Sequence, residues 1–214
     1  ERLVTTMAAS HALHDGLEVA AFIGGRGGVV LGDVEVPRSL CWVRETGQVS
    51  CVSVQSHSGR VACGNVSGSL FVLAPFSVGP GPPSWRVEAT TEGEASREGG
   101  VPTSASCSAD GSVVAATFEV FEDDPTTTTT RRSRRTTRVY ERRRLSVEED
   151  ENGGASPRRR RRRAATKALE LACDMATDVT CAHLSATGEW LASVSGGAVC
   201  AWRRADWQAK DPGP

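Results

Sequence analysis

The sequence lacks the short motifs that mark common catalytic and metal sites. Its seven cysteines stand singly, with no C-x-x-C pair, which argues against a zinc site. It contains no H-E-x-x-H, no Walker loop and no Ser/His/Asp elbow. No apolar run approaches the ~18 residues of a membrane span, and the first residues lack the order of a signal peptide. We therefore expect no enzymatic activity, no cofactor and no metal.

Aromatic residues are scarce, at 5% of 214 residues, and charge of one sign is concentrated in a single segment. Between Arg131 and Arg163 there are 14 arginines and 5 acidic residues, out of 25 basic and 26 acidic residues in the whole chain. The remainder thus has 11 basic and 21 acidic residues, a net charge of −10. Charge blocks of this kind are usually disordered.

Most of the cysteines lie in apolar, strand-like runs, where cysteine behaves as a small hydrophobic residue; these are Cys41, Cys51, Cys63, Cys181 and Cys200. The odd number and this placement predict reduced thiols in a cytoplasmic compartment.

One sequence pattern occurs three times along the chain, in residues 49–75, 105–117 and 178–202. Each copy has an apolar run, a polar turn that closes on glycine, and a second apolar run. The two longer copies add another glycine turn and a third apolar run. This pattern predicts the strands of a β-propeller blade. The blade-signature residues are Gly59, Gly68, Asp110, Gly111, Gly188 and Trp202.

The predicted fold class is all-β, a partial WD-type β-propeller of about three to four blades with a long disordered Arg/Thr-rich insertion. The first blades occupy residues 1–121, the basic low-complexity insertion 122–166, a further blade 167–207 and a tail 208–214. WD-type blades need about 40–45 residues each, so the chain holds too few to close a typical ring. We expect a fragment of a larger repeat protein.

Three local patterns allow a second interpretation. Residues 24–28 (GGRGG) resemble a phosphate-binding loop, but the apolar run that follows favours a hairpin turn over the required helix. Asn65-Val66-Ser67 fits the glycosylation pattern, although a turn is favoured. Trp202 stands where WD repeats place their tryptophan, and Arg203 replaces the usual aspartate.

The basic segment has three interpretations: phosphate contacts to nucleic acid, a nuclear localisation patch, or a solvated insertion that touches anionic lipids. Only Tyr140 interrupts it as an aromatic residue, which does not support base stacking. Ser146 follows arginines at a spacing favoured by basophilic kinases, so we expect a phosphorylation site there. The densest run comprises Arg158, Arg159, Arg160, Arg161, Arg162 and Arg163.

Segments within and between the repeats resemble the N-terminal propeller of the DmX-like (rabconnectin) family. The similar residues are 18–31, 49–52, 59–62 and 71–75, followed by 171–176, 184–192, 199–202 and 206–207. The Arg/Thr-rich insertion departs from the family pattern. The resemblance implies a cytosolic scaffold that assists assembly of the vacuolar-type proton ATPase and associates with vesicles.

We therefore expect a non-catalytic scaffold for protein partners, with proton-ATPase subunits and assembly factors implied by the resemblance. The expected location is the cytoplasm, including the periphery of endosomal or vacuolar membranes, where the basic insertion would meet anionic lipid. Two alternatives stay open: a WD scaffold of another complex, and an RNA- or chromatin-associated protein that uses the arginine tract. Nucleic acid is the less favoured partner.

Overall fold

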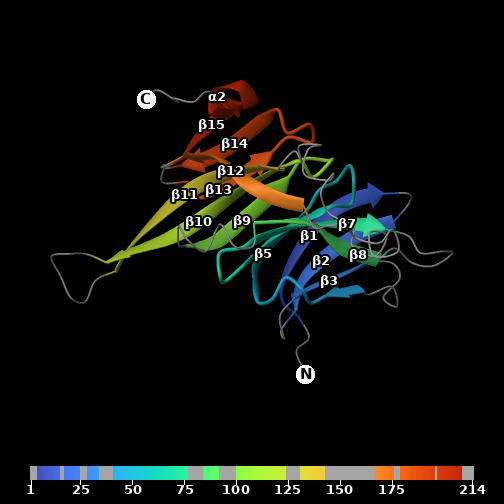
Figure 1. Ribbon diagram of the computed structural model, residues 1–214. Coiled ribbons are helices and arrows are strands. Elements are labelled where there is room, and N and C mark those ends of the chain that lie inside the picture. Colours follow the sequence, from blue (N-terminus) through green and yellow to red (C-terminus); the bar gives the residue numbers. More distant parts are fainter. Residues whose placement is uncertain are drawn as a thin grey trace, which may run out of the picture.

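In its described residues, the computed structural model shows a row of antiparallel β-sheets and a short helix near the C-terminus (Figure 1). The residues that it describes are 4–14, 17–24, 28–33, 41–76, 84–91, 100–123, 131–142, 167–175, 179–195 and 197–208. Ser146 and the arginines at 158–163 lie outside these residues, as does the insertion between 143 and 166.

The strands form four successive meanders, which we call blades 1 to 4. Blade 1 contains β1 (Val4–His14), β2 (Leu17–Gly24), β3 (Val29–Asp33) and β4 (Cys41–Val43). Blade 2 contains β5 (Val49–Val54), β6 (Val61–Asn65), β7 (Leu70–Phe76) and β8 (Ser84–Thr90). Blade 3 contains β9 (Val101–Cys107), β10 (Val113–Asp123), β11 (Arg131–Arg142) and β12 (Lys167–Met175). Blade 4 contains β13 (Cys181–Leu184), β14 (Trp190–Ser195) and β15 (Ala198–Arg203), before helix α2 (Arg204–Gln208).

Neighbouring blades pack face to face, and their first strands lie side by side. β5 contacts β1 on one side and β9 on the other, and β9 in turn contacts β13. β8 and β12 also form a short parallel pair, Lys167 with Ala89 and Ala168 with Thr90, which joins blades 2 and 3 into one sheet. This stacking of antiparallel meanders is the arrangement of a partial β-propeller.

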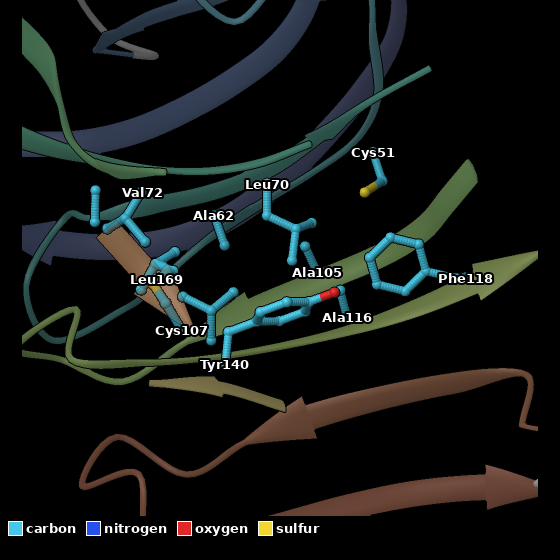
Figure 2. Packing of buried hydrophobic residues seen from close by; sticks show 12 residues of the cluster. Cys51, Ala62, Leu70, Val72, Ala105, Cys107, Ala116, Phe118, Tyr140 and Leu169 are labelled. Carbon is cyan, nitrogen blue, oxygen red and sulfur yellow. The ribbon is translucent and has the colours of Figure 1, made fainter. Parts of the chain in front are cut away.

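A separate apolar cluster fills each interface between blades. Val29 and Leu31 of blade 1 pack against Val61 and Leu73 of blade 2. Figure 2 shows the middle cluster, in which Leu70 and Val72 of blade 2 meet a blade 3 surface that includes Tyr140 and Phe118. The third cluster joins blades 3 and 4 through Val113, Ala115, Val139, Val179, Ala182, Leu191 and Trp207. Each fully buried large side chain contributes about 1.5–3 kcal/mol of hydrophobic free energy.

The predicted disorder of residues 122–166 is wrong for Arg131–Arg142, which form strand β11 paired along its length with β10. The register places Glu119 opposite Arg135, Glu122 opposite Arg132 and Asp123 opposite Arg131. Opposite charges at directly facing positions stabilise an antiparallel pair. Composition alone marks this segment as too basic to fold, whereas in the structure its backbone pairs with β10 on one edge and with β12 on the other.

The predicted blade at 167–207 is also wrong in its first part. Lys167–Met175 pairs with β11, with Val139 opposite Cys173, and completes blade 3 as its fourth strand. Blade 4 keeps three strands. Lys167–Met175 joins blade 3 because the edge of β11 that does not face β10 can pair with another strand. This segment is the first strand to follow β11 in the chain.

Several other predictions are confirmed. Residues 109–110 form the turn between β9 and β10, and Trp202 lies in the third strand of blade 4. Residues 29–33, after the glycine-rich run, form a strand paired with β2, as the hairpin interpretation predicts.

Candidate protein-interaction surface

Three turns of similar build join the first and second strands of blades 2, 3 and 4, and we call them the turn row. Each is closed by a backbone hydrogen bond between the residues that flank it. The donor and acceptor pairs are Gln55 N to Arg60 O at 2.7 Å, Ser108 N to Val113 O at 3.0 Å, and Ser185 N to Trp190 O at 2.8 Å.

The glycines of the turn row have left-handed backbone conformations, with φ of 61° at Gly59, 67° at Gly111 and 72° at Gly188. Side chains are unfavourable in this region, so glycine fits there best. Counted from the first flanking residue of each turn, Gly59 lies one position later than Gly111 and Gly188 do. Its N–H reaches back four residues to Gln55 O, whereas Gly111 N reaches back three residues to Ser108 O.

Asp110 organises the turn of blade 3. Its Oδ1 accepts hydrogen bonds from Ser108 Oγ at 2.6 Å, from Ser112 N at 3.0 Å and from Ser112 Oγ at 2.8 Å. Partial burial acts to raise the pKa of this carboxyl, but the hydrogen bonds from Ser108 and Ser112 and the charge of Arg142 outweigh it and lower the pKa to about 2. Asp110 is therefore ionised at neutral pH.

Hydrogen bonds between blades connect the three turns. Arg60 Nη1 donates to Ala109 O at 2.6 Å, and Ala109 N donates to Ala186 O at 2.7 Å. The turn of blade 2 is thus hydrogen-bonded to the turn of blade 3, and the turn of blade 3 is hydrogen-bonded to the turn of blade 4. A surface fixed in this way loses less conformational entropy when a partner binds.

Ion pairs within blade 2 and between blades support the turn row. Glu88 of β8 binds Arg60 Nε at 2.9 Å and Arg142 Nη2 at 3.0 Å. Burial acts to raise the pKa of Glu88, and the two arginines outweigh it and lower the pKa. Arg204 Nε reaches Glu141 across the next interface at 3.2 Å. These residues are 28 to 63 positions apart, so no local sequence pattern points to the network.

The turn row exposes short polar groups to solvent: Ser56, His57, Asp110, Thr187 and Glu189. Hydroxyl, imidazole and carboxylate groups on rigid turns offer directional hydrogen bonds to a partner. Mixed polar contacts of this type form much of an ordinary protein–protein interface.

The other predicted signature residues stabilise the blades. Gly68, with φ of 90°, donates its N–H to Asn65 O at 3.0 Å in the turn between β6 and β7. Asn65 is buried, and its Nδ2 donates to Thr46 O at 3.2 Å, in agreement with a turn role. Trp202 Nε1 donates to Ser193 Oγ of the neighbouring strand at 3.2 Å. These residues stabilise the turns and strands of the blades.

The buried cysteines are poor nucleophiles. Burial raises the pKa of Cys51 to about 11 and that of Cys107 to about 12, and it raises the pKa of Cys63 well above its usual value. All seven cysteines are free thiols. Among the described residues, no three histidine, cysteine or acidic side chains gather as a metal site. The described part of the chain likewise has no helix of sufficient length and apolarity to cross a membrane.

No protein-family model and no curated protein matches the chain. Among solved structures, it is similar to U3-55K, with 15% identity and a TM-score of 0.44 over 84% of this chain and 45% of the other. It is also similar to the Cps50 (Swd1) β-propeller domain of Myceliophteria thermophila, with 12% identity, a TM-score of 0.46 and coverage of 87% and 52%. The WD40 repeats of RRP9 give 16% identity, a TM-score of 0.43 and coverage of 84% and 45%. The chain spans about half the length of these structures.

Proposed function

We propose that the protein is a non-catalytic WD-type propeller scaffold that binds protein partners through the turn row. The observation that supports this most is the continuous connection of the three turns, from Arg60 to Ala109 and from Ala109 to Ala186. It holds exposed polar groups of three blades in one fixed arrangement. The ionised Asp110 favours a partner that presents basic or hydrogen-bond-donating side chains.

A pair of double variants tests this proposal. Ser56→Arg with Thr187→Arg adds bulk and positive charge to the turn row at two exposed positions. Val66→Arg with Ser67→Arg makes the same change in the turn at the opposite end of blade 2, also at exposed positions. Each protein is used as bait, and bound proteins are quantified by mass spectrometry.

The turn-row variant should lose the partners of the original chain, while the control variant retains them and both melt within about 2 °C of it, since surface changes usually alter stability little. Equal retention by both variants would show that the turn row is not the binding surface. Loss of partners by both variants, with unchanged melting temperatures, would show that binding is not specific to the turn row.

A narrower form of the proposal makes the proton ATPase the partner. It is supported by the resemblance of residues 171–176, 184–192 and 199–202 to the DmX-like family. In this form the protein acts in the cytoplasm at endosomal or vacuolar membranes, and the basic segment contacts anionic lipid. The test is direct binding of the purified soluble ATPase sector to the chain. No binding at micromolar concentrations refutes the narrower form and leaves the turn-row proposal intact.

A further inference from the structure

Three hydroxyl side chains stand side by side across blade 3. The register of the sheet places Ser104 of β9 opposite Thr117 of β10, and Thr117 opposite Thr137 of β11. Residues that face each other directly in an antiparallel pair carry their side chains on the same face of the sheet. We call these three residues the hydroxyl row.

The hydroxyl row faces blade 4. Thr117 follows Val113 and Ala115 at every second position of β10, and Thr137 is two residues from Val139 in β11. Val113, Ala115 and Val139 belong to the apolar cluster between blades 3 and 4. Because side chains alternate between the two faces along a strand, the row lies in that same interface.

The oxygens of the hydroxyl row are buried and carry no hydrogen bond to the described part of the chain. Thr117 and Thr137 are 0% exposed, and the Oγ atom of Ser104 is buried as well. A buried hydroxyl without a hydrogen bond bears the full cost of its lost hydration, so such groups are nearly always paired with protein or with ordered water. Three of them on neighbouring strands indicate a shared partner.

Polar side chains in the other interfaces bond directly to the chain. Trp85 Nε1 donates to Gly59 O at 3.0 Å, and Ser50 Oγ of blade 2 donates to Pro102 O of blade 3 at 2.6 Å. Trp207 contrasts with them, because it is buried between blades 3 and 4 and its Nε1 has no acceptor among the described residues. Four buried polar atoms of this kind, three hydroxyl oxygens and an indole nitrogen, thus gather in one interface.

The spacing of the hydroxyl row suits water. Facing residues of an antiparallel pair have Cβ atoms about 4.5–5.5 Å apart. Two oxygens that each lie about 2.8 Å from one tetrahedral water molecule are separated by about 4.6 Å. One water between two facing hydroxyls can therefore bond to both. A hydroxyl has one donor and two acceptor positions, so the central Thr117 can bond to a water on each side.

The surroundings of the row are small or polar. Ala115 lies next to it on β10, and Ala182 is the fully buried residue of β13 in the same cluster. Two residues beyond Ser104, Ser106 Oγ accepts a hydrogen bond from Leu184 N of blade 4 at 3.0 Å. A buried water needs both room and polar partners, and this part of the interface favours both.

We propose that two ordered water molecules bind in the interface between blades 3 and 4, one bridging Ser104 to Thr117 and the other bridging Thr117 to Thr137. They complete the hydrogen bonding of the hydroxyl row, in the same interface where Ser106 bonds directly to blade 4. The site is formed within the chain and is independent of any partner at the turn row.

A crystal structure of the purified chain, at a resolution that shows ordered water, tests the proposal directly. The expected result is a water oxygen within hydrogen-bonding distance of both members of each facing pair. Hydroxyls that bond to one another or to other residues of the chain, with no water between them, would overturn it.

Thermal unfolding of isosteric variants gives a second test. Thr117→Val removes the hydroxyl that both waters share, so the melting temperature should fall by about 2–4 °C for each hydrogen bond lost. In a dry row the same substitution removes an unpaired buried hydroxyl, so a rise in melting temperature would refute the proposal. Thr187→Val is the matched control, because Thr187 is exposed, and it should change the melting temperature by less than about 2 °C.

A double variant tests whether the two threonines share a water. Thr137→Val alone should lower the melting temperature, and it should lower it less when Thr117→Val is already present, because the shared water has then lost a partner. Thr187→Val should instead add to Thr117→Val without coupling. Additive losses in both pairs would count against a shared water. These measurements include no binding partner, so their failure leaves the turn-row proposal unaffected.

Discussion

The packing of successive turns predicts a large difference between two glycine-to-alanine substitutions. Gly188 and Gly197 both have left-handed backbones, with φ of 72° and 84°. A Cβ on Gly197 meets nothing within 4 Å, whereas a Cβ on Gly188 lies 3.2 Å from both Ser108 Cβ and Val113 Cγ2. The pair therefore separates backbone strain from the packing of blade 4 against blade 3.

Alanine in the left-handed region costs about 1–2 kcal/mol, and this is the only expected cost at Gly197. Overpacking a buried contact adds about 1–3 kcal/mol. We therefore expect Gly197→Ala to lower the free energy of unfolding by about 1 kcal/mol, and Gly188→Ala by about 3 kcal/mol. Val113 is fully buried.

Urea denaturation followed by tryptophan fluorescence measures both values on the same chain. The slope of the unfolding free energy against urea should stay unchanged, so that the midpoint alone reports stability. Equal loss in the two variants would refute packing of the Gly188 turn against Val113. An unchanged Gly197→Ala protein would contradict the backbone assignment.

Three further predictions concern single residues. Gly64→Ala should destabilise the chain by about 3 kcal/mol in the same assay, because its Cβ would lie 2.5 Å from the Pro102 ring; a neutral effect would contradict this contact. Asp110 has a folded-state pKa below its ordinary value, so its contribution is complete above pH 4 and is lost as pH falls toward 2. Asp110→Asn should accordingly reduce the acid dependence of the melting temperature in that window, and an unaltered acid profile would refute the role of this carboxylate. Iodoacetamide followed by mass spectrometry should label the exposed Cys200 in the folded protein and Cys107 only after denaturation; early labelling of Cys107 would show that its strand opens.

The local patterns that the sequence identified correctly all depend on neighbouring residues. Asp110 and Gly111 form a turn because the aspartate accepts nearby hydrogen bonds and the glycine tolerates positive φ. Val52 and Val54 lie in strand β5, as the apolar run of the first repeat predicts. Such features need only a few consecutive residues, so they can be recognised without the rest of the fold.

The failures involve partners that are distant in the sequence. The composition of Arg131–Arg142 predicts disorder, and the segment forms a strand through backbone pairing with β10 and β12, which lie at a distance in the sequence. Lys167–Met175 resembles a first strand of blade 4 until β11 is seen to offer it an edge. The Arg60–Glu88–Arg142 cluster brings three blade elements together and has no local signature.

The sequence by itself determined that the chain alternates short strands with tight turns, because apolar runs and turn residues act over a few consecutive positions. It also determined that three blades share a common turn with a glycine near its end. Only the tertiary structure decided which strand completes which blade, how the turns connect, and that Trp190 occupies the position buried as Val113 one blade earlier. The physical reason is that burial and ion pairing depend on residues brought together across blades, and those distances exist only in the folded chain.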